Sequence, residues 1–297
     1  MLNMIVTVLG ILVLAVLWVA LYDSNRFVLR KLEISDPRIR RQARAVVIAD
    51  LHNKQYGRDN ESLLCAIREQ KPDFILIAGD ILTASPGKTM KPALNFLRAL
   101  AEEYPVYYGN GNHEHRLKLY PETYGGMARE YAEGLREIGI EPLVNSHVSL
   151  AELGVTVYGA EIDRKYYRRF QIPGMEDDYL SKILGQADSS VYTVLLAHNP
   201  DYFPQYAGWG ADLTVSGHVH GGVARVPLWG RGVISPGMLP FPKYDGGIFR
   251  EGKAVMLLSR GLGMHTIPIR IFNPGELWVV DFSPLTDQKE KYVNTYM

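Results

Sequence analysis

Residues 45–52 read AVVIADLH, a short run of apolar, largely β-branched residues that ends in polar ones. The run 45–49 predicts a buried β-strand. Asp50 and His52 follow it two residues apart, and in an extended chain this spacing places both side chains on one side. A carboxylate and an imidazole placed in this way can share one metal ion.

The same pattern returns four more times along the chain. Predicted strands at 74–78, 106–108, 191–197 and 213–216 run into Gly79-Asp80, Gly111-Asn112-His113, His198 and Gly217-His218-Val219-His220. Helical patterns are found at 61–70 and 91–103, further strands are expected at 155–160, 255–258 and 277–282, and residues 163–188 indicate a loop or short helices. This alternation predicts an α/β fold in which the carboxyl ends of the strands meet at one crevice.

Each of these polar residues, taken alone, is more often a turn, a helix cap or a satisfied core residue than a metal ligand. Taken together they form a strong pattern, because five strand ends carry Asp, His or Asn and five of the eight histidines lie in these motifs. Oxygen and nitrogen ligands without thiolate suit Mn, Fe or Zn.

The ordered series Asp50-Leu51-His52, Gly79-Asp80, Gly111-Asn112-His113-Glu114, His198 and Gly217-His218-Val219-His220 resembles the calcineurin-like metallophosphoesterase superfamily, over about residues 45–282. The stretch 259–263, SRGLG, and the PIR at 268–270 are similar to the bacterial membrane-associated branch of that family. The resemblance implies an α/β fold that is a four-layer αββα sandwich, with the metals between the edges of two sheets.

The resemblance also implies a role for each motif residue. Asp50, His52, Asp80 and His220 would hold one divalent ion, and Asp80, Asn112, His198 and His218 the second, with Asp80 bridging. Mn is expected first, with Fe or Zn as alternatives, and no other cofactor-binding residues are expected. A metal-bound hydroxide would attack phosphorus, and His113 would donate a hydrogen bond or proton to the leaving group without binding metal.

At two places the sequence departs from the family pattern, and these departures narrow the functions that the resemblance implies. Asp80 is followed by Ile81-Leu82-Thr83, whereas the Ser/Thr protein phosphatases that share the fold carry Asp-Arg-Gly after this point, so a protein-phosphatase role is disfavoured. Val223 stands where the membrane-associated branch commonly has glutamine, so any substrate contact of that glutamine is absent.

The N-terminus differs from the rest of the chain. Residues 4–21 are apolar except for Thr7 and Gly10, and no charge precedes Asp23, so the segment is long enough to cross a bilayer. The chain lacks the basic start of a cleaved signal peptide, which favours a retained single-pass anchor in the cell membrane. Lys and Arg follow the segment but do not precede it, which favours a cytoplasmic catalytic domain. The predicted parts are an anchor at 1–22, a polar tether at 23–43, the catalytic domain at 44–285 and a tail at 286–297.

The favoured function is metal-dependent hydrolysis of a phosphodiester or pyrophosphate in a lipid-linked molecule, because an anchor would hold the site near the bilayer. A soluble-substrate phosphomonoesterase or cyclic-nucleotide phosphodiesterase is the alternative enzyme, and an inactive metal-binding membrane scaffold is the alternative from another class. Lys plus Arg equals Asp plus Glu at 32 each, so no nucleic acid partner is expected, and protein partners are unknown.

Four further features are open to two readings each. The segment 164–170, RKYYRRF, suits phosphate headgroups or a solvated loop, and Trp229 with residues 238–241 suits an apolar lip or core packing. Cys65 is expected in the core rather than as a reactive thiol. His115, His147 and His265 are expected at the surface or in packing, and His115 is the first candidate for an exception because it neighbours His113.

Overall fold

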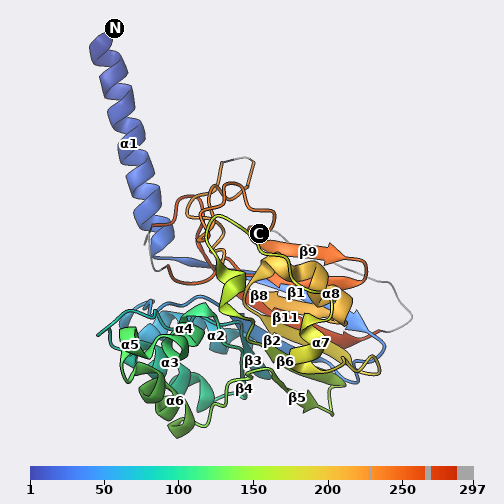
Figure 1. The fold of residues 1–297 in the computed structure, drawn as a ribbon. Helices are drawn as coiled ribbons and strands as arrows, with labels where there is room; N and C mark the ends of the chain where they lie inside the picture. The colour runs from blue at the N-terminus through green and yellow to red at the C-terminus, as the bar shows by residue number, and fades with distance from the viewer. Residues whose placement is uncertain (228, 265–268, 286–297) are drawn as a thin grey trace.

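Two mixed β-sheets form the body of the molecule in the computed structural model, which describes residues 1–227, 229–264 and 269–285 (Figure 1). The first sheet has the order β1-β11-β2-β3-β4 and contains β1 (Phe27–Asp36), β2 (Ala43–Ile48), β3 (Phe74–Ile77), β4 (Val106–Tyr108) and β11 (Gly275–Pro284). The second has the order β5-β6-β7-β8-β10-β9 and contains β5 (Ser146–Leu150), β6 (Val155–Ala160), β7 (Tyr192–Ala197), β8 (Leu213–Ser216), β9 (Gly247–Glu251) and β10 (Ala254–Leu258).

Helices connect these strands. The α-helices are α1 (Leu2–Ser24), α2 (Glu61–Gln70), α3 (Lys91–Ala101), α4 (Asn112–Leu119), α5 (Pro121–Tyr124), α6 (Met127–Glu137), α7 (Tyr179–Leu184) and α8 (Phe203–Trp209). Three short 3₁₀ helices are η1 (Arg58–Asn60), η2 (Arg164–Tyr167) and η3 (Pro200–Tyr202). The predicted tail at 286–297 and His265 lie outside the described residues.

The apolar core is divided by the two sheets. Side chains that alternate along β2 explain the division: Val46 and Ile48 pack with α2, α3 and α6 on one face, whereas Ala45 and Val47 pack against the second sheet. The far face of the second sheet packs against α7 and α8. Helices therefore cover one face of each sheet, and the other two faces pack together.

The strand directions bring polar residues to one place. Strands β2, β3 and β4 run parallel to one another in the first sheet, and β6, β7, β8 and β10 do so in the second. Their carboxyl ends therefore collect at one edge of each sheet, as the sequence pattern predicts.

The predicted polar tether at 23–43 is wrong in its central part. Residues 27–36 form β1, which pairs in parallel with β11 along its whole length, from Phe27 opposite Gly275 to Asp36 opposite Pro284. Leu32 and Ile34 point into the core between the sheets, and the alternating residues Lys31 and Glu33 are exposed. The folded body therefore begins near residue 27.

The predicted strands and helices are otherwise confirmed to within a few residues, and 163–188 contains only η2 and α7 with irregular chain. The prediction for Cys65 is wrong, because its side chain is exposed on α2. Helix α1 stands apart from the body in Figure 1, and its length and apolar composition suit either a membrane span or a signal sequence.

Candidate metal centre

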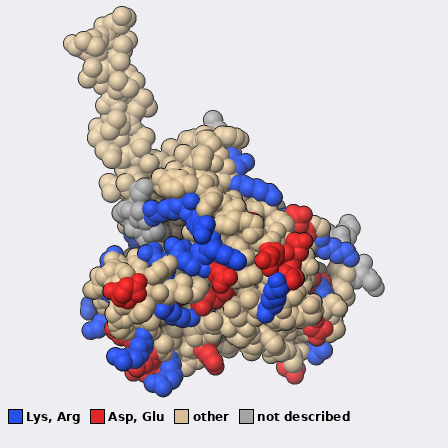
Figure 2. Space-filling model, in the orientation of Figure 1, with Lys and Arg blue, Asp and Glu red and all other residues tan. Residues whose placement is uncertain are grey.

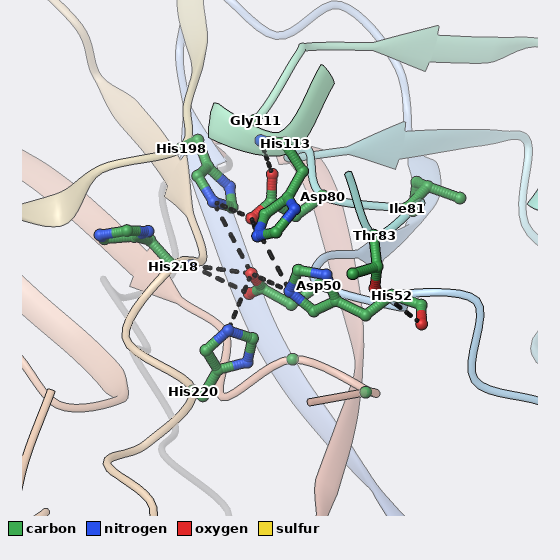
Figure 3. A network of polar contacts seen from close by, with 12 residues as sticks. Asp50, His52, Asp80, Ile81, Thr83, Gly111, His113, His198, His218 and His220 are labelled. Atoms are coloured by element: carbon green, nitrogen blue, oxygen red, sulfur yellow. Dashed lines mark hydrogen bonds and ion pairs between the residues drawn. The ribbon is translucent and has the colours of Figure 1, made fainter. Parts of the chain in front are cut away.

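The motif residues from both sheets converge between the two sheet edges (Figure 3). Asp50 and His52 follow β2, Asp80 follows β3, and Asn112 and His113 open α4 after β4. His198 follows β7, and His218 and His220 follow β8. All of these side chains are buried except His218, which is half-buried.

Two aspartates lie at the middle of this cluster. The Asp50 Oδ1 atom is 3.8 Å from His52 Nε2, 3.7 Å from His198 Nε2 and 3.7 Å from His220 Nε2. The Asp80 Oδ2 atom is 3.7 Å from His52 Nε2 and 3.1 Å from His198 Nε2. Carboxylates and imidazoles at these separations leave room for a cation between them.

Three groups of side chains have ligand atoms that all lie within 4.8 Å of one another. They are Asp50 with His52 and His220, Asp80 with His198 and His218, and His52 with Asp80 and His113. The first two groups are parts of the two predicted ligand sets. The third contains His113, which the resemblance assigns to catalysis rather than to metal binding.

The backbone at the cluster departs from the extended geometry that the sequence argument used. Asp50 and His52 both have left-handed backbone, each with φ of 50°, so their convergence does not come from an extended strand. Asp80, His218 and His220 are left-handed too, with φ of 55°, 72° and 54°. Such conformations cost roughly 1–3 kcal/mol each in residues other than glycine and are concentrated at functional sites.

Glycines allow the loops to approach closely. Gly79 has φ of 90°, and a Cβ atom there would overlap the backbone of Gly111. A Cβ atom on Gly217 would overlap the Asp50 carboxylate. These two positions bring the ends of β3 and β4, and those of β2 and β8, within ligand distance of each other.

Glu114 holds two of the loops together, a role that the sequence analysis missed. Its Oε2 atom accepts hydrogen bonds from the backbone N–H groups of Asp80 and Gly111, each at 2.9 Å. Its Oε1 atom accepts from the Ile81 N–H at 2.9 Å and from the Tyr108 hydroxyl at 2.8 Å. Glu114 stands three residues after the N-cap Gly111 and accepts from its N–H, which is the glutamate half of a capping box, and a Glu at this position could have been read from the sequence.

Arg270 supports the loop that packs against Asp50. This residue is named in the sequence analysis, which assigns it no role. Its guanidinium is buried and donates from Nη2 to the carbonyls of Arg260, Gly261 and Gly263 at 2.8, 3.1 and 2.7 Å. The Gly263 N–H in turn donates to the Asp50 carbonyl at 2.6 Å. The loop that follows β10 is thereby fixed against Asp50.

Backbone groups decide which ring nitrogen carries the proton in His198 and in His113, and the outcome differs between the two. His198 Nδ1 lies 2.6 Å from the Ala78 carbonyl and must donate to it, so in the neutral ring the Nε2 lone pair faces Asp80. His113 Nδ1 instead accepts from the Ala84 N–H at 2.9 Å, so the proton of a neutral ring is on Nε2. His198 Nε2 is therefore arranged as a ligand, and His113 Nε2 as a donor.

The electrostatics of the centre without metal favour bound cations. Burial and the neighbouring Asp80 charge raise the pKa of Asp50. Burial also acts to raise the pKa of Asp80, but His198, His113 and His52 outweigh it and hold that pKa well below its usual range. Burial opposes protonation of His198, yet Asp80 and Asp50 raise its pKa to about 10. A metal ion must displace this proton to bind.

A cavity of about 300 Å³ opens beside the cluster. His113, Asn112 and His218 line its inner part, and Tyr167 lies over His218 with their ring centres 5.1 Å apart. The outer wall carries five cationic side chains and one carboxylate; these are Arg116, Arg164, Arg168, Arg169, Lys243 and Asp201. The cavity therefore suits an anionic substrate.

The donor set fits divalent metal ions. The Asn112 Oδ1 atom is buried and has no hydrogen-bond partner among the described residues, as expected of an oxygen that serves a metal. Carboxylate, amide and imidazole ligands without sulfur suit Mn, Fe or Zn. Exposed clusters of acidic residues are common in proteins without a metal, but in this cluster two buried aspartates lie among several buried imidazoles.

Buried carboxylates and imidazoles beside a cavity with a cationic wall suit a metal-dependent hydrolase that acts on an anionic substrate. The model of the calcineurin-like phosphoesterase family matches residues 43–222, more than half of the chain, and the chain belongs to this family. The protein is therefore a metallophosphoesterase.

Curated relatives agree with this assignment. YkuE, an uncharacterized metallophosphoesterase of Bacillus subtilis, is 27% identical over 79% of this chain and 77% of its own. Cj0846, an uncharacterized metallophosphoesterase of Campylobacter jejuni, is 25% identical over 85% of this chain, which covers only 62% of that longer relative. YaeI of Escherichia coli, named a phosphodiesterase, is 27% identical over 73% of each chain.

The other described histidines lie outside the cluster. His115 Nε2 is 3.8 Å from a Glu161 carboxylate oxygen, and burial lowers its pKa. His147 stacks on Tyr158 with ring centres 4.8 Å apart. Neither histidine belongs to a ligand group of the centre.

Proposed function

We propose that the protein hydrolyses a phosphate ester at a centre of two divalent ions, with Asp80 bridging them. Asp50, His52 and His220 would complete one site, and Asn112, His198 and His218 the other. The single observation that supports this most is the position of Asp80, which belongs to two of the three ligand groups and lies within 4 Å of imidazoles from both sheets.

The chain's own residues divide the work around that centre. Two divalent ions, when bound, supply positive charge for the phosphoryl oxygens and lower the pKa of water for attack on phosphorus. His113 lines the cavity and carries its proton on Nε2, 4.0 Å from Asp80 Oδ2, so it is placed to protonate the departing oxygen. Asn112 contributes a neutral oxygen, which keeps the centre more positive than a third carboxylate would.

We favour a phosphodiester or pyrophosphate of a lipid-linked molecule as the substrate. The cationic outer wall of the cavity suits phosphate, helix α1 suits retention in a membrane, and the relative YaeI is named a phosphodiesterase. In this proposal the chain belongs to the membrane-associated branch, α1 is a single-pass anchor, and the four-layer αββα domain lies in the cytoplasm and uses Mn. The anchor would end near residue 22, and the catalytic domain would extend to residue 285.

The experiment that tests the function uses the full chain in detergent, loaded with Mn and then stripped by chelation. Phosphomonoesters, phosphodiesters, cyclic nucleotides and lipid-linked pyrophosphates are compared as substrates. We expect turnover of the diester or pyrophosphate classes that disappears on metal removal. Faster turnover of soluble monoesters or cyclic nucleotides favours the alternative enzyme, and full metal occupancy without turnover of any class favours the membrane scaffold.

A further inference from the structure

Large apolar side chains stand exposed on loops beside the cavity. We define the apolar lip as Trp229, Met238 and Phe241 with Phe170 and Ile172, whose exposed fractions are 63%, 44%, 49%, 71% and 51%. The rings of Trp229 and Phe241 pack with centres 5.6 Å apart, and the Phe170 N–H donates to the Gly237 carbonyl at 2.7 Å. The lip is thus one connected surface. An exposed apolar patch of this kind marks a site of interaction with a membrane or with another protein.

Hydrogen bonds tie the segment 270–273 both to the foot of α1 and to the chain that leads into the lip. The Asn273 N–H donates to Asp23 Oδ2, and the Arg270 N–H donates to Ser24 Oγ, each at 3.0 Å. In the same segment, the Ile271 carbonyl accepts from the Arg225 N–H at 3.0 Å, at the start of the loops that carry the lip. Figure 1 shows these loops, orange in the colour bar, rising beside the lower half of α1. A bilayer that receives α1 would therefore meet the lip.

A cationic band lies below the apolar lip. Arg168, Arg169 and Lys243 are exposed at the cavity wall, and Arg26 and Lys54 lie at the foot of α1, where Lys54 Nζ donates to Asn25 Oδ1 at 3.0 Å. Figure 2 shows a largely uncharged surface over the loops, with Lys and Arg beneath and beside it and Asp and Glu next to them. Apolar side chains above cations match the acyl and headgroup levels of a bilayer.

The catalytic cavity opens into this surface. Phe241 and Ile172 of the lip line the cavity together with Arg168, Arg169 and Lys243, while His113 and His218 line its inner end. A phosphate group that lies at the headgroup level would therefore face the metal centre, and its apolar tail would remain beside the lip.

We propose that the apolar lip inserts into the same leaflet that α1 enters, so that the cavity opens against the bilayer and receives phosphate esters of membrane lipids sideways from it. This inference rests on the proposed anchor and phosphoesterase function. Because α1 already holds the body at the membrane, insertion of the lip is intramolecular and needs no separate capture of the protein.

The insertion is tested with nitroxide labels on the full chain in nanodiscs of phosphatidylcholine and phosphatidylglycerol. Cys65→Ser removes the native thiol, and Trp229→Cys, Met238→Cys, Val8→Cys and Glu133→Cys each provide one label. We expect labels at 229 and 238 to collide with oxygen rather than with a water-soluble nickel chelate. The label at 133, on exposed α6, is the control and should show the reverse.

The label at Val8, on α1, separates the proposal that α1 is an anchor from the proposal that the lip inserts. If the label at Val8 is in lipid while those at 229 and 238 are in water, the anchor stands and the lip inference is wrong. If the label at Val8 is in water, the anchor itself fails. Labels at 229 and 238 that are shielded from both collision partners indicate a protein occupant, such as a second copy, and also contradict insertion.

A functional test uses Trp229→Ser combined with Met238→Ser, because neither side chain lines the cavity. The substrates are soluble bis(4-nitrophenyl) phosphate and the 4-nitrophenyl ester of phosphatidic acid in the same nanodiscs. We expect the lipid ester to be cleaved about tenfold or more slowly, and the soluble diester at an unchanged rate. Val144→Ser, which removes an apolar side chain of 38% exposure elsewhere, is the matched control and should change neither rate.

Equal slowing on both substrates, or no slowing on either, contradicts delivery from the bilayer. A wild-type chain that cleaves neither diester contradicts the proposed function instead, and the label measurement then decides the lip by itself.

Discussion

At the scale of the residue, His113 is the side chain whose role is set most narrowly by its contacts. We predict that His113→Ala keeps a near-normal metal content while the chemical step slows by roughly 10² or more on a substrate with a poor leaving group. The loss should be smaller for a nitrophenolate leaving group, because less charge needs a proton. Rates on both substrates and metal content in the same samples measure this.

His115→Ala is the control for that variant, because it removes a histidine of the same helix that contacts Glu161 rather than the centre. Its rates should stay near those of the wild type. An equal loss on both leaving groups in His113→Ala argues against proton donation and leaves stabilisation of the phosphoryl oxygens, and no loss removes His113 from the mechanism.

A second prediction at the scale of the residue concerns the metal content of an Asp80 variant. Asp80→Ala should lose both ions together, because its carboxylate shares one ligand group with His52 and another with His198 and His218, whereas His52→Ala should mainly weaken one site. Elemental analysis of metal per chain, with circular dichroism to confirm folding, makes the measurement. Two ions retained in Asp80→Ala would exclude the bridge.

The residues of the centre were visible in the sequence, but the way in which they are held was not. Asp, His and Asn at strand ends stand out because apolar strands precede them. The left-handed backbone of Asp50 leaves no local trace in the sequence, because the residues that pack against it, Gly217 and Gly263, come from distant segments. Arg270 likewise acts on Asp50 through a loop that only the folded chain brings near.

At the scale of the element, β1 and α4 show why pattern alone was insufficient. Strand β1 is charged and has only Leu32 and Ile34 buried, as an edge strand allows, and its partner β11 lies at the other end of the chain. Helix α4 reads NHEHRLKL and has no apolar period. It forms because Gly111 and Glu114 cap its start and its first turn faces the centre.

The position of β1 predicts how truncated chains behave. A chain that starts at Tyr22 keeps β1, whereas one that starts at Ala43 loses it and exposes the core beside β11. Removing Leu32 and Ile34 from the core costs about 1.5–3 kcal/mol each. At roughly 2–4 °C per kcal/mol, the shorter chain should melt roughly 6–24 °C lower.

Scanning calorimetry of the two truncated chains, both loaded with metal, measures the difference. Both chains lack the apolar part of α1, so the comparison measures the loss of residues 22–42, which contain β1 together with Asp23, Ser24 and the buried Ile39. Equal melting temperatures would mean that these residues add no stability to the body, as expected of a tether.

At the scale of the whole molecule, the centre joins the two sheets. Asp50, Asp80 and Asn112 come from the first sheet, and His198, His218 and His220 come from the second. Metal binding should therefore stabilise the body as a unit. At a metal concentration of 100 times Kd the gain is about 2.7 kcal/mol, and chelation should lower the melting temperature by roughly 5–10 °C.

The pKa of His198 gives this stabilisation a pH dependence. In the metal-free fold that pKa is about 10, raised from 6.5 by Asp80 and Asp50 against the effect of burial. The metal-free fold thus gains stability from this proton fully below pH 6.5 and loses it as the pH rises towards 10. A metal ion replaces the proton, so its apparent affinity rises by up to about tenfold per pH unit over that window.

We therefore expect the gap between the melting temperatures with and without metal to widen from pH 6.5 to pH 9. Calorimetry at several pH values, with chelator or with saturating Mn, measures it. The Asp80→Ala chain is the control and should show almost no gap, because its ligand groups are incomplete. A gap that narrows as the pH rises would mean that metal binding does not displace the His198 proton, and would remove His198 from the ligand set.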